Sequence, residues 1–408
     1  MDRERLKIAM LSVHSCPLER LGGEDTGGMS VYIRELAREL GGFGHKVDIY
    51  TRAHSHLDGR IVEMSPNVRL IHLEAGEVGE INKLAIYPHA HDFARNIATF
   101  SKESGIEYDL IHSHYWLSGC VGIWLQDWWN IPHITMFHTL GAVKNAVGVG
   151  DTEPELRIES EGCVVEKCHR IIAATEREKA DLVHHYNIVL DKIKVIPCGI
   201  NLDLFQPVDK EEARRRLGMN GHKVVLFVGR IQRLKGLDRL LGAMSYLRQD
   251  EDVKLMVVGG DARTHSEVER LRKVSGDMQI QSMVDFVGQV DQKELPFYYS
   301  AADVCVIPSY YESFCLVALE SLACGTPLVA TNVGGISGVV KQGENGYIVA
   351  GNDPVHIADA LGVLLSGQYT PDSVRDAVIE YEWSNIAEAV VEEYQEMLKK
   401  GVHSKTFS

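Results

Sequence analysis

Short runs of β-type residues alternate with longer helical patterns along all 408 residues, and they do so in two successive series. Strand-length runs separated by amphipathic stretches such as MSVYIRELAREL are typical of parallel strands joined by helices. The first series is KIAMLSV, KVDIYT, VRLIHLE, DLIHSH, HITMFH and RIIAAT, and the second is KVIPCG, KVVLFVGR, KLMVVGG, MVDFVGQ, DVCVIPS and PLVATN. The sequence therefore predicts an α/β fold with two doubly wound, Rossmann-like domains.

The boundary between the two series falls at PCGINLDLFQP, where two prolines and a glycine interrupt the pattern. We expect domains at residues 1–197 and 198–380, followed by a helix within 381–408 that crosses back over the first domain. Ligands of open α/β sheets bind at the carboxyl ends of the strands. Two facing domains of this kind predict a central cleft that binds a ligand.

Composition narrows the classes of partner. The formal net charge of −15 argues against nucleic acid or an anionic membrane surface, although a local Arg and Lys cluster for a phosphorylated ligand stays open. The eight cysteines form no CxxC pair, which indicates reduced thiols rather than a zinc site or a disulfide framework. The first apolar run is too short for a signal peptide or a membrane span. We expect a cytoplasmic protein without an integral membrane segment; its oligomeric state is open, with a homodimer as one option.

The stretch YYESFCLVALESLACG places Glu312 and Glu320 eight residues apart in an otherwise apolar run. Eight residues are about two helical turns, so on a helix the pair would share a face. The flanking residues predict a strand, a loop that carries Glu312, and a helix that carries Glu320 and ends at Gly325. The wet edge of an amphipathic helix and a functional role explain this pattern about equally well.

Two loops are candidates for binding an anionic ligand. LGGEDTGGMSVYIREL places glycines before a helix, where backbone N–H groups can approach phosphate, but its spacing is neither a dinucleotide fingerprint nor a P-loop. FVGRIQRLKGLDRLL places Arg230 and Lys235 after a strand, where two cations can compensate the charge of a departing diphosphate. A solvated pair of loop charges is the alternative for these two residues.

Other polar and aromatic residues favour structural interpretations. His112 and His114 have the spacing of a ligand pair on a strand, but no carboxylate pattern accompanies them, so no metal site is expected. His184 and His185 are expected on a surface helix. The tryptophans are expected in the core and between helices rather than as a platform for a sugar; they are Trp116, Trp124, Trp128 and Trp129.

GGM before a helix, GRIQRLKG in mid-chain, and ESFCLVALE followed by GTPLVATNVGG together resemble the retaining glycosyltransferases of family 4 over nearly the whole chain. The resemblance implies the two-domain GT-B fold and transfer of a sugar, with retention, from a nucleoside diphosphate sugar to a hydroxyl group. A UDP-sugar is the first candidate donor, and neither a cofactor nor a metal is implied.

The same resemblance implies the donor site. Glu320 would hold the ribose hydroxyls, and Glu312 would lie against the transferred sugar. Arg230 and Lys235 would bind the diphosphate, and the base would pack near residues 287–290. Donor contacts are further expected at Gly28, Val290, Ser313, Phe314, Cys315 and Leu316.

In the first domain, LSVHSCPL, GGMSVY, IHSHYWLSG, FHTLGAVKN and HHY resemble the D-inositol-3-phosphate glycosyltransferases of mycothiol synthesis, and more distantly the sucrose-phosphate synthases. The acceptor would be a small phosphorylated molecule, an inositol phosphate or a sugar phosphate. His138 would be the catalytic histidine beside the reacting sugar, together with Arg230, Lys235 and Glu312. The acceptor phosphate would lie among Lys83, Tyr115, Thr139 and Arg157, with a further contact from Ser30, which stands where these enzymes usually carry Asn.

Alternative functions are a glycosyltransferase with a lipid or polysaccharide acceptor, a nucleotide-sugar epimerase, a pyridoxal-phosphate phosphorylase of similar shape, and a sugar-nucleotide-binding protein without activity. The first-domain cluster argues against an epimerase, which needs no acceptor pocket. The presence of Glu312 and His138 argues against a mere binding protein.

Overall fold

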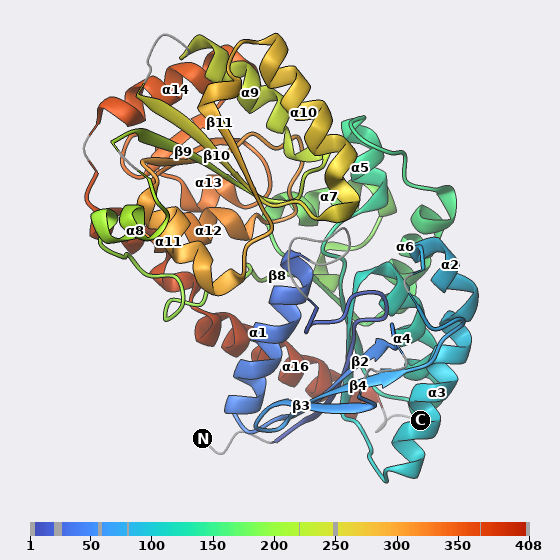
Figure 1. Ribbon diagram of the computed structural model, residues 1–408. Coiled ribbons are helices and arrows are strands. Elements are labelled where there is room, and N and C mark those ends of the chain that lie inside the picture. The colour runs from blue at the N-terminus through green and yellow to red at the C-terminus, as the bar shows by residue number, and fades with distance from the viewer. Residues whose placement is uncertain are drawn as a thin grey trace.

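The computed structural model describes residues 5–19, 27–55, 59–79, 81–219, 221–247, 252–367 and 369–404, with only the backbone for 400–404. Two β-sheets, each covered by helices, form an upper and a lower domain in Figure 1. The predicted α/β architecture of two doubly wound domains is therefore confirmed.

The first sheet has the order β3-β4-β2-β1-β5-β6-β7-β8 and is parallel except where β3 pairs with β4. Its strands are β1 (Lys7–Leu11), β2 (Lys46–Arg52), β3 (Ile61–Ser65), β4 (Val68–Leu73), β5 (Leu110–His114), β6 (His133–Met136), β7 (Arg170–Ala173) and β8 (Ile193–Val195). The assignment of KVIPCG to the second series is wrong, because β8 pairs with β7 in the first sheet.

The helices of the first domain connect these strands. They are α1 (Gly28–Gly42), α2 (Lys83–Ile86), α3 (Ala90–Glu103), α4 (Tyr115–Trp129), α5 (Gly141–Val147), α6 (Glu155–Lys167) and α7 (Glu176–Tyr186). Helix α1 forms where sequence periodicity predicts it, because its apolar residues recur every three to four positions and bury one face.

The second sheet has the order β11-β10-β9-β12-β13-β14 and is parallel throughout. Its strands are β9 (Lys223–Val228), β10 (Val253–Val258), β11 (Val284–Gly288), β12 (Val304–Ile307), β13 (Leu328–Thr331) and β14 (Gly346–Val349). Its helices are α8 (Lys210–Arg216), α9 (Leu237–Tyr246), α10 (His265–Asp277), α11 (Leu295–Ala301), α12 (Leu316–Ala323), α13 (Ile336–Val339), α14 (Pro354–Ser366) and α15 (Pro371–Arg375).

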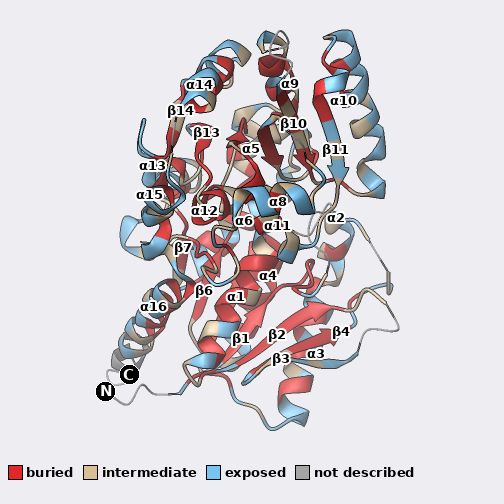
Figure 2. Cartoon of the chain, turned by 60° about the vertical axis from the view of Figure 1, so that its left-hand side comes forward, coloured by how far each residue is buried: buried red, intermediate tan, exposed pale blue. Residues whose placement is uncertain are grey.

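The last helix, α16 (Trp383–Ser404), returns to the first domain and packs against α1 (Figure 1). Its Trp383 ring meets the edge of Tyr32, and its Tyr394 hydroxyl lies 2.7 Å from Nδ1 of His112 on β5. Figure 2 shows the buried residues concentrated in the sheets and on the inner faces of the helices, with the exposed residues outside.

Candidate active site

The loop between β12 and α12 carries Glu312, and α12 carries Glu320, which confirms the predicted order of strand, loop and helix. The loop ends at Cys315, whose φ of 87° lies in the left-handed region. Below it, a Cβ atom on Gly334 would lie only 2.8 Å from the carbonyl oxygen of Phe314, and the Gly335 N–H donates to that same oxygen. The glycine pair is thus needed for the backbone to hold this loop at the start of α12.

Glu312 and Lys235 form one ion pair. The Lys235 Nζ lies 2.7 and 2.8 Å from the two carboxylate oxygens, and the Ser309 hydroxyl donates to one of them at 2.7 Å. Both charged side chains are largely buried. From the sequence, Glu312 was expected to contact the sugar and Lys235 to contact the diphosphate independently. In the structure, the carboxylate of Glu312 neutralises the charge of Lys235, so a diphosphate would share this cation with Glu312.

Arg230 follows β9 and reaches the start of α1 in the other domain. A Cβ atom on Gly27 would lie 3.9 Å from its Nε, and one on Gly28 would lie 3.4 Å from a methyl group of Leu316 at the start of α12. Neither α1 nor α12 has an acidic residue in its first turn. Two helix N-termini and a guanidinium therefore meet between the domains, and together they favour an anion there.

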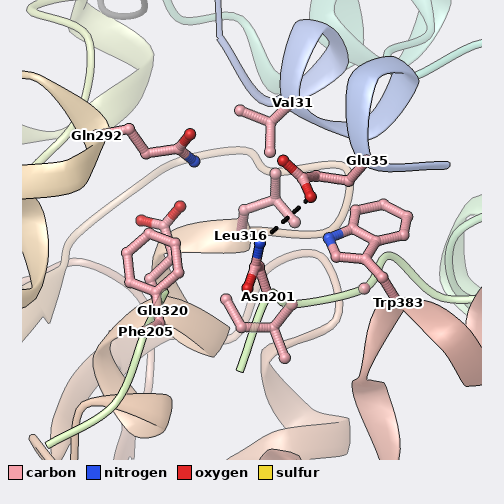
Figure 3. Close-up of a pocket in the computed structure, with 10 residues that line it drawn as sticks. Val31, Glu35, Asn201, Phe205, Gln292, Leu316, Glu320 and Trp383 are labelled. Carbon is pink, nitrogen blue, oxygen red and sulfur yellow. Dashed lines mark hydrogen bonds between the residues drawn. The ribbon is translucent and has the colours of Figure 1, made fainter. Parts of the chain in front are cut away.

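Glu320 borders a small hollow between the domains, and Figure 3 shows its carboxylate below Gln292, with Leu316 between it and Glu35 of α1. Burial raises the pKa of Glu320 to about 7, against the opposing effect of the hydrogen bond that the Tyr299 hydroxyl donates at 2.7 Å. On the opposite wall the Glu35 carboxylate accepts from the Asn201 amide, drawn as the dashed line in Figure 3. The remaining lining residues are Val31, Gly199, Ile200, Phe205, Gln292, Leu316 and Trp383.

Gln292 closes this hollow on the side of the expected base site. Its side-chain oxygen accepts from Arg34 Nη2 of α1 at 2.5 Å, which joins the two domains. Val290, the predicted base contact, lies two residues earlier in the same segment and packs on the core. A ribose held by Glu320 would therefore lie beside side chains of both domains.

The four residues proposed for the acceptor phosphate come together in the first domain. The Arg157 guanidinium lies 4.8 Å and the Lys83 ammonium 6.0 Å from the centre of the Tyr115 ring. Arg157 Nη2 donates to the carbonyl oxygen of Thr139 at 2.9 Å and to its hydroxyl at 3.0 Å. The ring of His14, which the sequence analysis did not single out, packs on Tyr115 at 4.4 Å. Their role in binding an acceptor stays a prediction.

Arg157 is held by a buried ionic network that the sequence analysis missed. Its Nε donates to Glu161 at 2.7 Å, and its Nη1 lies 2.9 Å from Glu153. Glu161 is fully buried and also accepts from the Gly141 N–H and the Tyr186 hydroxyl. Part of the signal was present as R-x3-E, since Arg157 and Glu161 lie four apart on α6 and are neighbours there, whereas Glu153 precedes the helix. Every nitrogen of the guanidinium is thus already engaged by protein atoms.

Lys144 adds a further cation to this network through an ion pair with Glu153. Burial, and then repulsion from Arg157 and Lys83, lowers the pKa of Lys144 to about 8. The cations of the cluster therefore outnumber its two carboxylates, Glu153 and Glu161, by one. A dianion would meet a pocket whose own charges are largely but not fully compensated.

His138 follows β6 with a φ of 60°, again in the left-handed region. Its Nε2 lies 3.0 Å from Nδ1 of His114, the last residue of β5. Burial lowers the pKa of His138 to about 3. The imidazole is therefore neutral near pH 7 and acts in hydrogen bonding rather than as a cation.

The hydrogen bond of the Ser30 hydroxyl goes to Ser15 and not to one of the four residues proposed for the acceptor phosphate. Ser30 is completely buried, and its hydroxyl shares this hydrogen bond with Ser15 at 2.8 Å, so an acceptor contact would require the residues that cover Ser30 to move. Of the tryptophans, Trp116 is buried and two others pack on the core. Trp128 is 44% exposed, but its ring meets the ring of His91 at 5.7 Å between α4 and α3, so it packs between helices as expected. His184 and His185 lie in the last turn of α7.

The donor loop touches the acceptor half directly. Tyr311, next to Glu312, packs on the first-domain core. The Ser313 hydroxyl lies 3.5 Å from Glu178 of α7, and Arg177 of the same helix donates to the carbonyl oxygen of Asn332. A ligand bound at one site is therefore within reach of the other.

Within the residues that the structure describes, no three His, Cys, Asp or Glu side chains gather as they would around a metal ion. None of the helices in the same residues combines the length and apolar character that a membrane crossing requires.

Two family models cover most of the chain. Residues 26–204 match the model described as Glycosyltransferase Family 4, and residues 209–382 match the model described as Glycosyl transferases group 1. The first match spans the first sheet except β1, and the second spans the whole second sheet.

Curated relatives align over nearly the full length. The D-inositol 3-phosphate glycosyltransferase of Corynebacterium jeikeium is 39% identical over 97% of this chain and 98% of its own length. That of Corynebacterium diphtheriae is 40% identical over 95% and 94%. Among solved structures, the sucrose-phosphate synthase from Thermosynechococcus elongatus superposes with a TM-score of 0.89 at 34% identity, covering 97% of this chain and 100% of that one.

Proposed function

Because this chain belongs to the family 4 glycosyltransferases, with the GT-B fold, we propose that it moves a sugar from a nucleoside diphosphate sugar to a hydroxyl group of a small phosphorylated acceptor. The observation that carries the proposal is the convergence of Lys83, Tyr115, Thr139 and Arg157 beside the loop of Glu312. The names of the relatives support a phosphorylated acceptor, since both inositol 3-phosphate and sucrose phosphate chemistry involve a phosphate monoester.

The donor is a nucleoside diphosphate sugar, with a UDP-sugar as the first candidate. Its ribose hydroxyls donate to the Glu320 carboxylate in the hollow of Figure 3. Its diphosphate lies between Arg230 and the N-termini of α1 and α12, where the charge is favourable. The transferred sugar then lies between His138 and Glu312.

Transfer proceeds with retention by front-face substitution. The acceptor oxygen bonds to the anomeric carbon while the bond from that carbon to the phosphate oxygen breaks, and the acceptor proton passes to the departing phosphate oxygen. Arg230, the shared cation Lys235 and the helix N-termini stabilise the charge that develops on the diphosphate. Glu312 orients the sugar rather than attacking it, because Lys235 and Ser309 engage its oxygens.

The reaction needs neither a divalent metal nor a cofactor, since basic groups of the chain compensate the diphosphate. Initial rates after treatment with a chelator should equal those of untreated enzyme. Activity that is lost with the chelator and restored by Mg²⁺ or Mn²⁺ would refute this part of the proposal.

The cytoplasm is the proposed location, because all eight cysteines are free thiols. A homodimer stays a prediction.

Release of nucleoside diphosphate tests the proposed function. UDP-, ADP- and GDP-sugars are combined with inositol phosphate, fructose phosphate and their unphosphorylated parents, and release is compared with a sample that lacks acceptor. We expect release that depends on a phosphorylated acceptor, with inositol phosphate the first candidate and a sugar phosphate the second, which the similarity to sucrose-phosphate synthase favours.

Other outcomes contradict the proposal. If the unphosphorylated parents are used equally well, the cluster does not select for a phosphate. Activity only with a lipid or polysaccharide would assign the enzyme to another acceptor class. Interconversion of the donor sugar without release indicates an epimerase. Binding of donor without turnover of any acceptor indicates a binding protein.

A further inference from the structure

His114 stands directly behind the predicted active-site histidine. Strands β5 and β6 are parallel neighbours, with His114 opposite Met136 in the register, so the residues that follow the two strands meet at one edge of the sheet. His114 Nδ1 and His138 Nε2 lie 3.0 Å apart, which is a hydrogen bond between two imidazoles.

Both rings are neutral at physiological pH. Burial lowers the pKa of His138 to about 3, and burial with the neighbouring His112 and His138 holds the pKa of His114 well below its ordinary value. A neutral imidazole carries one N–H, so only one of the two facing nitrogens holds a proton. Either His114 donates to His138 or the reverse.

The surroundings of His114 distinguish these two arrangements. Its other nitrogen, Nε2, is buried and has no hydrogen-bond partner in the described part of the chain. If His138 donated, this Nε2 would carry a buried N–H without an acceptor, which is rare in proteins, whereas a buried acceptor without a donor is tolerated more often. The proton is therefore on Nδ1 of His114.

We infer that His114 is a positioning residue that fixes the tautomer of His138, so that His138 presents Nδ1–H as a hydrogen-bond donor to an oxygen of the transferred sugar. His138 is only partly buried, and Nδ1 is its one ring nitrogen not taken by His114. The inference rests on the proposed function for the identity of the ligand. It does not rest on it for the tautomer, which is a property of the free protein.

Two strained backbone positions adjoin the imidazole pair. Tyr115, which follows His114, and His138 itself have φ values of 77° and 60°. Positive φ is strained at such residues and persists only where the surrounding contacts hold it. The backbone beside both rings is therefore fixed by its surroundings, as the fixed direction of one N–H requires.

Nitrogen NMR of histidine-labelled protein without substrate tests the inference directly. The His138 signals are identified by their loss in His138→Gln, and the shifts of Nδ1 and Nε2 tell which one bears the proton. We expect Nδ1–H at His138. A proton on His138 Nε2 in the unaltered protein overturns the inference, whatever the enzyme proves to transfer.

Two substitutions and a control extend the test. His114→Asn keeps an amide nitrogen that can donate in place of Nδ1, so the tautomer and most of the turnover should be retained. His114→Leu removes the donor, and we expect a shift toward Nε2–H with a loss in kcat of about tenfold. His112→Asn replaces a neighbouring buried ring whose Nδ1 bonds to Tyr394 rather than to His138, and it should leave the His138 signals unchanged. Equal kcat in the asparagine and leucine variants would indicate that His114 only fills space.

Discussion

The two halves of the site are built in different ways. In the second domain, Glu312, the start of α12 and Glu320 lie on one continuous stretch, and a glycine pair supports the backbone beneath it. In the first domain, the candidate acceptor residues come from four separate segments and are joined by buried ion pairs around Arg157. The donor half therefore depends mainly on local backbone geometry, and the acceptor half depends on long-range packing and charge compensation.

The largest expected effect distinguishes the halves by stability. Arg157→Ala would leave the fully buried Glu161 without its guanidinium and the partly buried Glu153 with Lys144 alone, and breaking a buried ion pair costs about 3–5 kcal/mol. We expect a loss of that size in urea unfolding. Lys83→Ala is the control and should lose less than about 0.5 kcal/mol, as surface substitutions do.

A partial rescue sharpens this prediction. Adding Glu161→Gln to Arg157→Ala removes one uncompensated charge and should recover part of the loss. Equal stability of Arg157→Ala and Lys83→Ala would contradict the account of the acceptor half as an ionic network.

In the donor half, Glu312→Ala should lower kcat by on the order of a hundredfold, because the reacting sugar loses its contact. The donor KM should stay the same or fall, since the substitution releases Lys235 to the diphosphate. Ser309→Ala removes one hydrogen bond from the same carboxylate and should cost about tenfold or less. A raised donor KM with unchanged kcat in Glu312→Ala would mean that the ion pair serves donor binding.

A smaller effect concerns pH. Burial raises the pKa of Glu320 to about 7, above its value in the unfolded chain, so the native state binds this proton more tightly. The contribution of Glu320 to stability is therefore complete below about pH 4 and is lost as the pH rises through about 7.

Urea unfolding of the wild type and Glu320→Gln across this pH range measures that contribution. The stability of the wild type relative to the variant should fall between about pH 4 and about pH 7. A constant difference would contradict the buried state of this carboxyl group. The comparison with Glu320→Gln also cancels the opposite pH dependence of the buried histidines, whose lowered pKa values favour the native state at higher pH.

The same contrast explains which parts of the fold and of the site could be predicted from the sequence. The strand, loop and helix around Glu312 and Glu320 were predicted because hydrophobic pattern and glycine spacing are local signals. Strand β3 was missed because it is a half-exposed edge strand without an apolar run, and β14 because it is short and begins at a glycine.

Contacts between distant residues could not be predicted from pattern. Lys235 and Glu312 are 77 positions apart, and nothing local in either segment indicates that their charges meet. The bond between Ser30 and Ser15 similarly depends on how α1 packs against the loop after β1. The acceptor residues were named only through resemblance, and their convergence became visible only in the structure.

The central claim is that each half of the site binds its own substrate, and paired Michaelis constants of two variants test it most directly. Lys83→Met should lower acceptor kcat/KM by about ten- to a hundredfold and leave the donor KM unchanged, because charge-assisted hydrogen bonds contribute about 1.5–3 kcal/mol. Glu320→Ala should raise the donor KM and leave the acceptor KM unchanged. If Lys83→Met leaves the acceptor KM unaltered, or if both variants alter both constants alike, the division of the site into a donor half and an acceptor half is wrong.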